Sequence, residues 1–146
     1  MTMIIREEEA RDIAARELLL DATFGPERHE KTCERLRAGR HAAPGLSFVA
    51  ECESEIVGTL RLWHVTAGGC EALLLGPLAV SKAYRGFGWG ACLTHVALNR
   101  AAALGHKAVI LVGDWAYYQR FGFNADVVKT LEMPGPVDRA RFLGLE

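Results

Sequence analysis

The chain has 146 residues, a length that builds one domain around a single core. Hydrophobic residues make up 50% and charged residues 24% of it, a composition that excludes a disordered protein. The 17 basic and 18 acidic residues leave a formal net charge of −1, which argues against binding to a long stretch of nucleic acid.

The sequence also carries no sign of a membrane span or of secretion. Its longest apolar runs, residues 72–75 and 108–112, are far shorter than the roughly 20 residues that a span needs. The N-terminus lacks the basic and apolar regions of a signal peptide. The cysteines at positions 33, 52, 70 and 92 form no CxxC pair, so we expect reduced thiols and no metal site. These features predict a cytoplasmic protein.

The N-terminal part predicts one strand and two helices. Residues 3–6 are typical of a strand, and residues 7–20 of a helix whose acidic start, Glu7–Glu9, meets the positive end of the helix dipole. Gly25-Pro26 ends this helix, and residues 27–37 predict a second, very polar helix that must lie on the surface. Gly39 and residues 43–45 are expected in a loop.

Three strands follow, over residues 47–52, 56–65 and 71–80. The short polar turns between them, at residues 53–55 and 66–69, predict an antiparallel meander. Gly76-Pro77 interrupts the third strand. Because proline has no N–H to donate to a neighbouring strand, we expect a bulge or a splay of the sheet at this point.

A glycine-rich loop, residues 81–90, leads into an amphipathic helix over residues 88–104, with Gly105 as its cap. Residues 107–112 are typical of a buried parallel strand and residues 115–120 of a short helix. Further strands are expected at residues 127–131 and 141–145, on either side of a loop at 133–136. The order of these elements predicts an α+β domain with a mixed, mostly antiparallel sheet flanked by helices.

The loop Arg85-Gly86-Phe87-Gly88-Trp89-Gly90 is the most informative segment. Alternate glycines let successive N–H groups point into one concavity at a helix N-terminus, which suits a phosphate, and Lys82 and Arg85 add positive charge. A Walker A loop would end in Gly-Lys-Ser/Thr, which this loop lacks. A Rossmann turn would read Gly-x-Gly-x-x-Gly, but Asp114 could imitate the acid of that motif, so a nucleotide-binding α/β domain stays open.

Two motifs together resemble a known family. Arg85–Gly90, preceded by Gly76-Pro77-Leu78-Ala79-Val80, is similar to the acetyl-CoA-binding motif of the GCN5-related N-acetyltransferase (GNAT) superfamily. Tyr117-Tyr118-Gln119-Arg120-Phe121-Gly122-Phe123 resembles the second motif of that family, an aromatic helix that ends in Gly-Phe. The resemblance extends from about Met3 to Phe123 and is strongest to a bacterial branch of predicted acetyltransferases.

The resemblance implies the acyl-CoA N-acyltransferase fold, a three-layer α/β arrangement with a splayed strand. It further implies direct transfer of an acetyl group from acetyl-CoA to a primary amine of a small molecule or a protein, without a metal or a covalent enzyme intermediate. In the family, the splayed strand pairs with the pantetheine arm and donates an N–H to the thioester oxygen, and the pyrophosphate reaches the glycine loop.

The resemblance also assigns residues to the site. The implied cofactor-binding residues are Leu78, Ala79, Val80, Arg85, Gly86, Phe87, Gly88, Trp89, Gly90 and Ala91. Of these, we expect Phe87 and Trp89 to pack the loop down rather than to touch the ligand. Tyr118, four residues before Gly122, is implied as the acid that protonates the departing CoA thiolate. Tyr117 points about 100° away from it on a helix and cannot share that role.

The acceptor side of the site stays open. His64 is a candidate general base, and Asp114 either orients a group near the cofactor or caps the helix at Trp115, so we assign no base. Because the sequence ends within what looks like a last strand, we expect an acceptor site that is open or that a second subunit completes in a homodimer. A non-catalytic acyl-CoA-binding regulatory module is the alternative to an enzyme.

Overall fold

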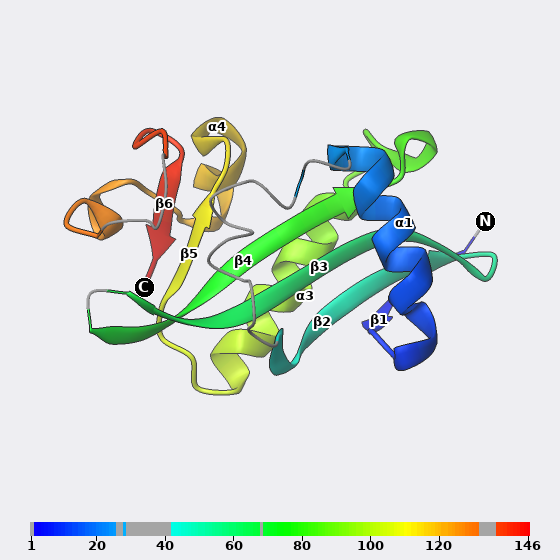
Figure 1. The fold of residues 1–146 in the computed structure, drawn as a ribbon, viewed down its shortest axis with the longest axis horizontal. Coiled ribbons are helices and arrows are strands. Elements are labelled where there is room, and N and C mark those ends of the chain that lie inside the picture. Colours follow the sequence, from blue (N-terminus) through cyan, green and yellow to red (C-terminus); the bar gives the residue numbers. More distant parts are fainter. Residues whose placement is uncertain (1, 26–27, 29–41, 68, 132–136) are drawn as a thin grey trace.

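The computed structural model describes residues 2–25, 28, 42–67, 69–131 and 137–146. Its six strands form one sheet in chain order (Figure 1): β1 (Met3–Glu7), β2 (Ala42–Cys52), β3 (Glu55–Ala67), β4 (Cys70–Val80), β5 (Val109–Val112) and β6 (Phe142–Leu145). Every neighbouring pair is antiparallel except β4 and β5, which are parallel. The predicted mixed, mostly antiparallel sheet is confirmed.

Helices cover both faces of this sheet. α1 (Ile13–Phe24) follows a short 3-10 helix over Ala10–Asp12 and packs on β3 and β4, in front of the sheet in Figure 1. α3 (Trp89–Ala103) packs on the opposite face against β2, β3 and β4. α4 (Trp115–Tyr118) follows β5 and continues as a 3-10 turn over Gln119–Phe121. The three layers predicted from the sequence are therefore present.

The main core lies between the sheet and α3. Leu93, Ala97 and Ala101 recur at helical spacing along one side of α3 and are completely or almost completely buried. They pack in one cluster with Leu60 and Leu62, alternate residues on one face of β3. This packing fixes the start of α3, and with it the glycine loop, relative to the end of β4.

The predicted start of the first helix is wrong. Glu7 ends β1, and helical structure begins only at Ala10. Glu8 therefore lies before the first helical turn. Its Oε2 atom accepts hydrogen bonds from Arg16 Nη1 at 2.6 Å and from Arg61 Nη2 at 2.9 Å. The Glu8 side chain is 5% exposed, so its burial is offset by two guanidinium groups rather than by a helix dipole.

Two further expectations are corrected. Residues 43–45 lie within β2 rather than in a loop, and the strand accommodates Gly45, at φ +77°, through a register shift between Ala42 and Ser47. Residues 127–131 form no strand, because Asn124 Oδ1 accepts a hydrogen bond from the Val127 N–H at 3.2 Å and the chain turns into a 3-10 helix over Asp126–Val128.

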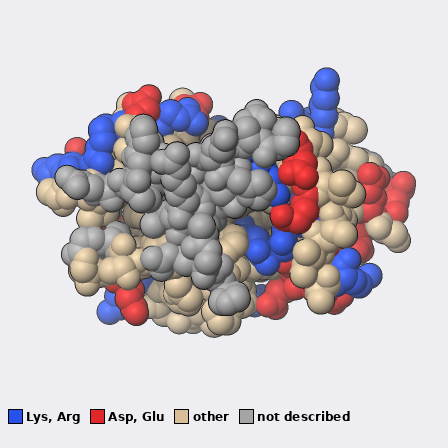
Figure 2. Space-filling view, in the orientation of Figure 1, with Lys and Arg blue, Asp and Glu red and all other residues tan. Residues whose placement is uncertain are grey.

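Gly39, most of the predicted polar helix at residues 27–37 and the predicted loop at 133–136 lie outside the described residues. Arg28, which is described, is 7% exposed and donates hydrogen bonds to Glu17 and Asp21 of α1, at 2.9 Å each. Arg28 itself is therefore buried against α1, whereas the sequence predicts that this segment lies on the surface. Acidic and basic side chains are interspersed over the described part of this face (Figure 2), as the near-zero net charge leads one to expect.

Candidate functional site

The site begins where β4 separates from β5. β3 pairs with β4 as far as Val80, whereas β5 pairs with β4 only at Leu73 and Leu74 in the part of the chain that the structure describes. Between the pairs Leu62–Leu75 and Leu60–Leu78, one residue of β3 faces two residues of β4, Gly76 and Pro77. This is a β-bulge, so both features expected at Gly76-Pro77, a bulge and a splay, are confirmed.

Beyond the bulge, β4 has one free edge. The Ser81 N–H donates to the Val57 carbonyl at 2.7 Å, which fixes which residues of β4 face β3. Because hydrogen-bonded positions alternate along an antiparallel pair, the backbone groups of Ala79 also face β3. Those of Leu78 and Val80 then face away from it, into the gap between β4 and β5. An extended ligand with amide groups can pair with this edge as a further strand would.

The glycine loop adjoins this edge. Gly86 and Gly88 both have φ +85°, a conformation that favours glycine, and Gly88 is the N-cap of α3. Arg85 is exposed, and its Nε donates to the Val80 carbonyl at 2.8 Å, which ties the loop to the end of β4. The N-terminus of α3 is thus presented beside the free edge, with a guanidinium next to it, as a phosphate site requires.

Gly90 has a different role from the other two glycines. A Cβ atom at this position would lie 3.3 Å from the Tyr117 hydroxyl and 3.8 Å from side-chain atoms of Leu78 and Val80. The first turn of α3, the splayed part of β4 and the Tyr117 hydroxyl therefore meet at Gly90. The expectation that Phe87 packs the loop down is wrong, because its side chain is 70% exposed, while Trp89 is half-buried.

Tyr118, the residue after Tyr117 in α4, packs against the end of β5. Its ring packs against Gly113, where a Cβ atom would come within 2.5 Å of Cε2, and its ring centroid is 5.9 Å from that of Phe123. Burial raises the pKa of Tyr118 to about 12, so the phenol stays protonated well above neutral pH. The rings of Tyr117 and Tyr118 form an edge-to-face contact, with their centroids 4.9 Å apart and their planes at 86°.

The contact of Tyr117 with the glycine loop was missed by sequence reasoning. Its hydroxyl approaches Gly90, while its ring lies under the guanidinium of Arg120, 4.5 Å from Cζ to the ring centroid. The only sequence signal was that Tyr117 stands next to Tyr118 in the aromatic motif. The structure therefore brings Leu78, Val80, Gly90 and Tyr117 together, and the ring centroid of Tyr118 lies 4.9 Å from that of Tyr117.

The base candidates from the sequence lie elsewhere. Asp114 caps α4, because its Oδ1 accepts a hydrogen bond from the Ala116 N–H at 3.1 Å, which decides between the two roles considered for it. His64 is exposed, with its ring centroid 5.5 Å from that of His106. Among the described residues, no group of three or more His, Cys, Asp or Glu side chains could hold a metal ion.

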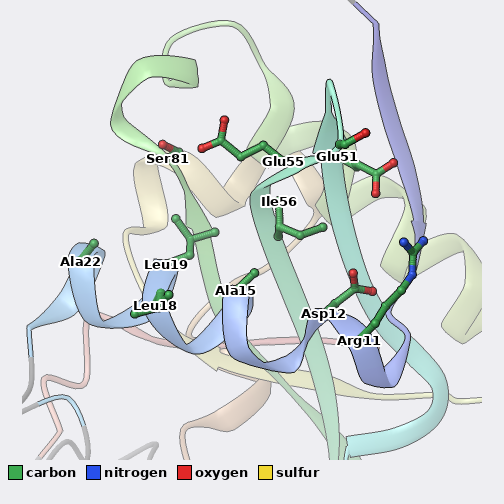
Figure 3. Close-up of a pocket in the computed structure, with 11 residues that line it drawn as sticks. Arg11, Asp12, Ala15, Leu18, Leu19, Ala22, Glu51, Glu55, Ile56 and Ser81 are labelled. Atoms are coloured by element: carbon green, nitrogen blue, oxygen red, sulfur yellow. The ribbon is translucent and has the colours of Figure 1, made fainter.

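A separate groove of about 590 Å³ lies between α1 and the turn that joins β2 to β3 (Figure 3). Small and apolar side chains of α1 form one wall, and Glu51 of β2 and Glu55 of β3, on either side of the turn, line the other. Its lining includes Arg11, Asp12, Ala15, Leu18, Leu19, Ala22, Glu51, Ser54, Glu55, Ile56 and Ser81. None of the predicted site residues is among them, so the groove and the β4 edge are different places.

Comparison with known proteins identifies the family. Residues 43–125 match the acetyltransferase (GNAT) domain. The uncharacterized N-acetyltransferase YhbS of Escherichia coli K12 is 32% identical over 124 residues, which are 84% of this chain and 74% of that protein. The chain belongs to the GNAT acetyltransferase family. The family and the acyltransferase class predicted from the two motifs are confirmed, and a Rossmann-type domain is set aside.

Solved GNAT structures agree with this fold. The crystal structure of Escherichia coli YhbS in complex with CoA superposes with a TM-score of 0.81 at 29% identity, covering 97% of this chain and 79% of that one. A GNAT acetyltransferase from Brucella melitensis in complex with acetyl-CoA superposes with a TM-score of 0.73 at 30% identity, covering 99% of this chain and 96% of that one.

In the described part of the chain, no helix is long and apolar enough to cross a membrane.

Proposed function

We propose that this GNAT chain binds acetyl-CoA along the free edge of β4 and transfers its acetyl group directly to a primary amine of a small molecule or a protein. The observation that carries the proposal is the edge at Leu78 and Val80, which β5 does not pair with and where Arg85 holds only the Val80 carbonyl, beside a glycine-lined helix N-terminus. The relatives with bound CoA and acetyl-CoA support this choice of ligand.

In this arrangement the pantetheine arm pairs with β4 at Leu78–Val80. The pyrophosphate is held by the loop from Arg85 to Ala91, where backbone N–H groups, the dipole of α3 and the Arg85 guanidinium all favour negative charge. The two left-handed glycines shape the loop, and Gly90 keeps the approach free of a side chain. Phe87 and Trp89 belong to the same loop and flank the bound pyrophosphate.

The chemical step begins when the neutral amine nitrogen attacks the thioester carbon. The carbonyl oxygen gains negative charge, and an N–H of the splayed strand stabilises it. The C–S bond then breaks, and the thiolate of CoA leaves. Tyr118 donates the proton that this thiolate takes up, since burial keeps its hydroxyl protonated. The nitrogen of the new amide releases its proton to solvent, and Tyr118 takes a proton back from solvent, so the phenol is restored for the next turnover.

The decisive assay measures thiol release from acetyl-CoA with a panel of primary amines. Tyr118→Phe should slow release by about 10²-fold while acetyl-CoA affinity changes by less than about twofold, as for loss of a general acid. Tyr117→Phe is the matched control and should retain most of the rate. The reverse result, a slow Tyr117→Phe and a normal Tyr118→Phe, would assign the proton donor to Tyr117.

Calorimetric titration separates the remaining alternatives. Binding of acetyl-CoA without turnover of any amine would favour the non-catalytic regulatory module. Failure to bind CoA, or binding of NAD instead, would overturn the proposal. The molecular mass in solution, with and without acetyl-CoA, tests whether a homodimer completes the acceptor side.

A further inference from the structure

The bulge in β4 is held by a side chain rather than by the neighbouring strand. The buried Gly76 carbonyl accepts a hydrogen bond from the indole Nε1 of Trp63 at 2.7 Å. Trp63 comes from β3, where its register partner is Leu74, so its indole leans along the strand toward the bulge. Since Pro77 has no N–H, the ladder is interrupted at this point, and the indole gives the Gly76 carbonyl a donor from outside the ladder.

A neighbouring side chain of β3, Arg61, contacts the Trp63 indole. The Arg61 guanidinium lies over the indole, with Cζ 5.2 Å from the ring centroid, a cation–π contact. Arg61 Nη2 donates to Glu8 Oε2 at 2.9 Å, and Glu8 also accepts from Arg16 of α1. The ion pairs of Glu8 with Arg16 of α1 and Arg61 of β3 thus fix Arg61, and Arg61 packs on the indole that binds the bulge.

The position of the bulge gives this contact a consequence for chemistry. The Gly76 carbonyl and the Pro77 nitrogen share one peptide plane, and the Leu78 N–H belongs to the next. Because the proline ring locks its own φ angle, a single torsion, ψ of Pro77, separates the two planes. Fixing the Gly76 carbonyl therefore leaves ψ of Pro77 as the one torsion that sets the direction of the Leu78 N–H, the first backbone donor that faces the gap beyond the bulge.

We propose that Trp63 is a positioning residue, whose indole N–H holds the Gly76 carbonyl and thereby aims the Leu78 N–H at the thioester oxygen of acetyl-CoA. This inference rests on the proposed function, because it needs acetyl-CoA in the β4 gap. Trp63 acts through the backbone and does not touch the reacting atoms.

The test replaces Trp63 by the isostere β-(3-benzothienyl)alanine, which keeps the shape of the ring but has sulfur in place of the N–H. Trp63→Phe is a simpler second variant, and the same isostere at Trp115, an exposed residue of α4, is the matched control. The readout is the infrared band of acetyl-CoA labelled with carbon-13 in its thioester carbonyl, which needs no acceptor. A hydrogen bond to this carbonyl lowers its stretching frequency.

In the Trp63 isostere, the carbonyl band of bound acetyl-CoA should move to higher frequency, because the donor is no longer aimed. Affinity for CoA, which lacks the carbonyl, should change by less than about twofold, and kcat with an active amine should fall about tenfold or more, as for a weakened oxyanion donor. The Trp115 isostere should leave band and rate unchanged.

An unchanged band, or CoA affinity falling in step with the rate, would overturn the role of Trp63 and leave the proposed function standing. If the wild-type protein bound no acetyl-CoA, the proposed function itself would fail. A urea unfolding midpoint for each variant shows whether it is folded before its band is read.

Discussion

A substitution at Gly113 can displace the Tyr118 ring without changing its phenol. A Cβ atom at Gly113 would lie 2.5 Å from Tyr118 Cε2, 3.0 Å from Cδ2 and 3.2 Å from Leu111 Cδ1. Ordinary carbon–carbon contacts are about 3.5–4.0 Å, so Gly113→Ala displaces the ring by about 1 Å. The backbone cannot easily yield instead, because the Gly113 N–H donates to the Arg141 carbonyl at 2.8 Å.

The size of the effect follows from this displacement. Overpacking of this kind lowers the free energy of unfolding by about 1–3 kcal/mol. A catalytic group misplaced by about 1 Å loses about 10²-fold in rate, so we expect kcat for thiol release to fall by about that factor. Acetyl-CoA affinity should change little, because Gly113 lies at the end of β5 and not at the β4 edge.

Gly144→Ala is the matched control for Gly113→Ala. A Cβ atom at Gly144 would lie 2.8 Å from Cγ1 atoms of Val127 and Val128, so it overpacks the protein to a similar degree without pressing on Tyr118. In a Tyr118→Phe background, Gly113→Ala should have almost no further effect on kcat. A Gly113→Ala enzyme with wild-type kcat, or with the same added loss in the Tyr118→Phe background, would refute Tyr118 as the proton donor.

Three further outcomes test the charged and buried groups. Glu8→Gln should lower the free energy of unfolding in urea by about 3–5 kcal/mol, because it removes the buried carboxylate that Arg16 and Arg61 share and leaves Arg16 only its pair with Glu17. Glu9→Gln, in an exposed pair with Arg11, should change it by less than about 1 kcal/mol. A hydrogen bond from the Arg6 side chain lowers the pKa of Asp12 from 3.8 to about 2. The ionised Asp12 carboxylate therefore stabilises the folded protein above pH 4, and this contribution to the free energy of unfolding is lost as the pH falls toward 2. Asp12→Asn should flatten this part of the acid unfolding curve. Burial raises the pKa of Tyr118 from 10.0 to about 12. The contribution of the neutral phenol to the free energy of unfolding is therefore complete below pH 10 and is lost as the pH rises toward 12. Spectrophotometric titration of the wild type and of Tyr118→Phe can follow the ionisation of this phenol.

Features written in a few consecutive residues could be predicted from the sequence. Gly76-Pro77 predicts the bulge because proline itself has no N–H to donate to the neighbouring strand. Asp114 at an N-cap and the glycine loop before α3 are equally local signals. The apolar run before residue 113 predicted a buried parallel strand, and β5 is one.

The rest depended on contacts between distant residues. Glu8 was placed in a helix because its partner Arg61 is 53 positions away, and no local pattern reports such a pairing. The approach of Tyr117 to Gly90 requires α3, β4 and α4 to be assembled first. Residues 127–131 are apolar enough for a strand, but the Asn124 side chain turns the chain there, and the sheet is extended by β6 instead.

The gap between β4 and β5 also bears on aggregation. A strand edge with free N–H and C=O groups is normally a template for pairing with another protein. Here the free edge at Leu78 and Val80 lies inside the sheet, with β5 and β6 beyond it (Figure 1), rather than at an outer border. The splay therefore places this edge between strands of one sheet, where β5 and β6 flank it and make it less accessible to the strand of a neighbouring protein than an outer border would be.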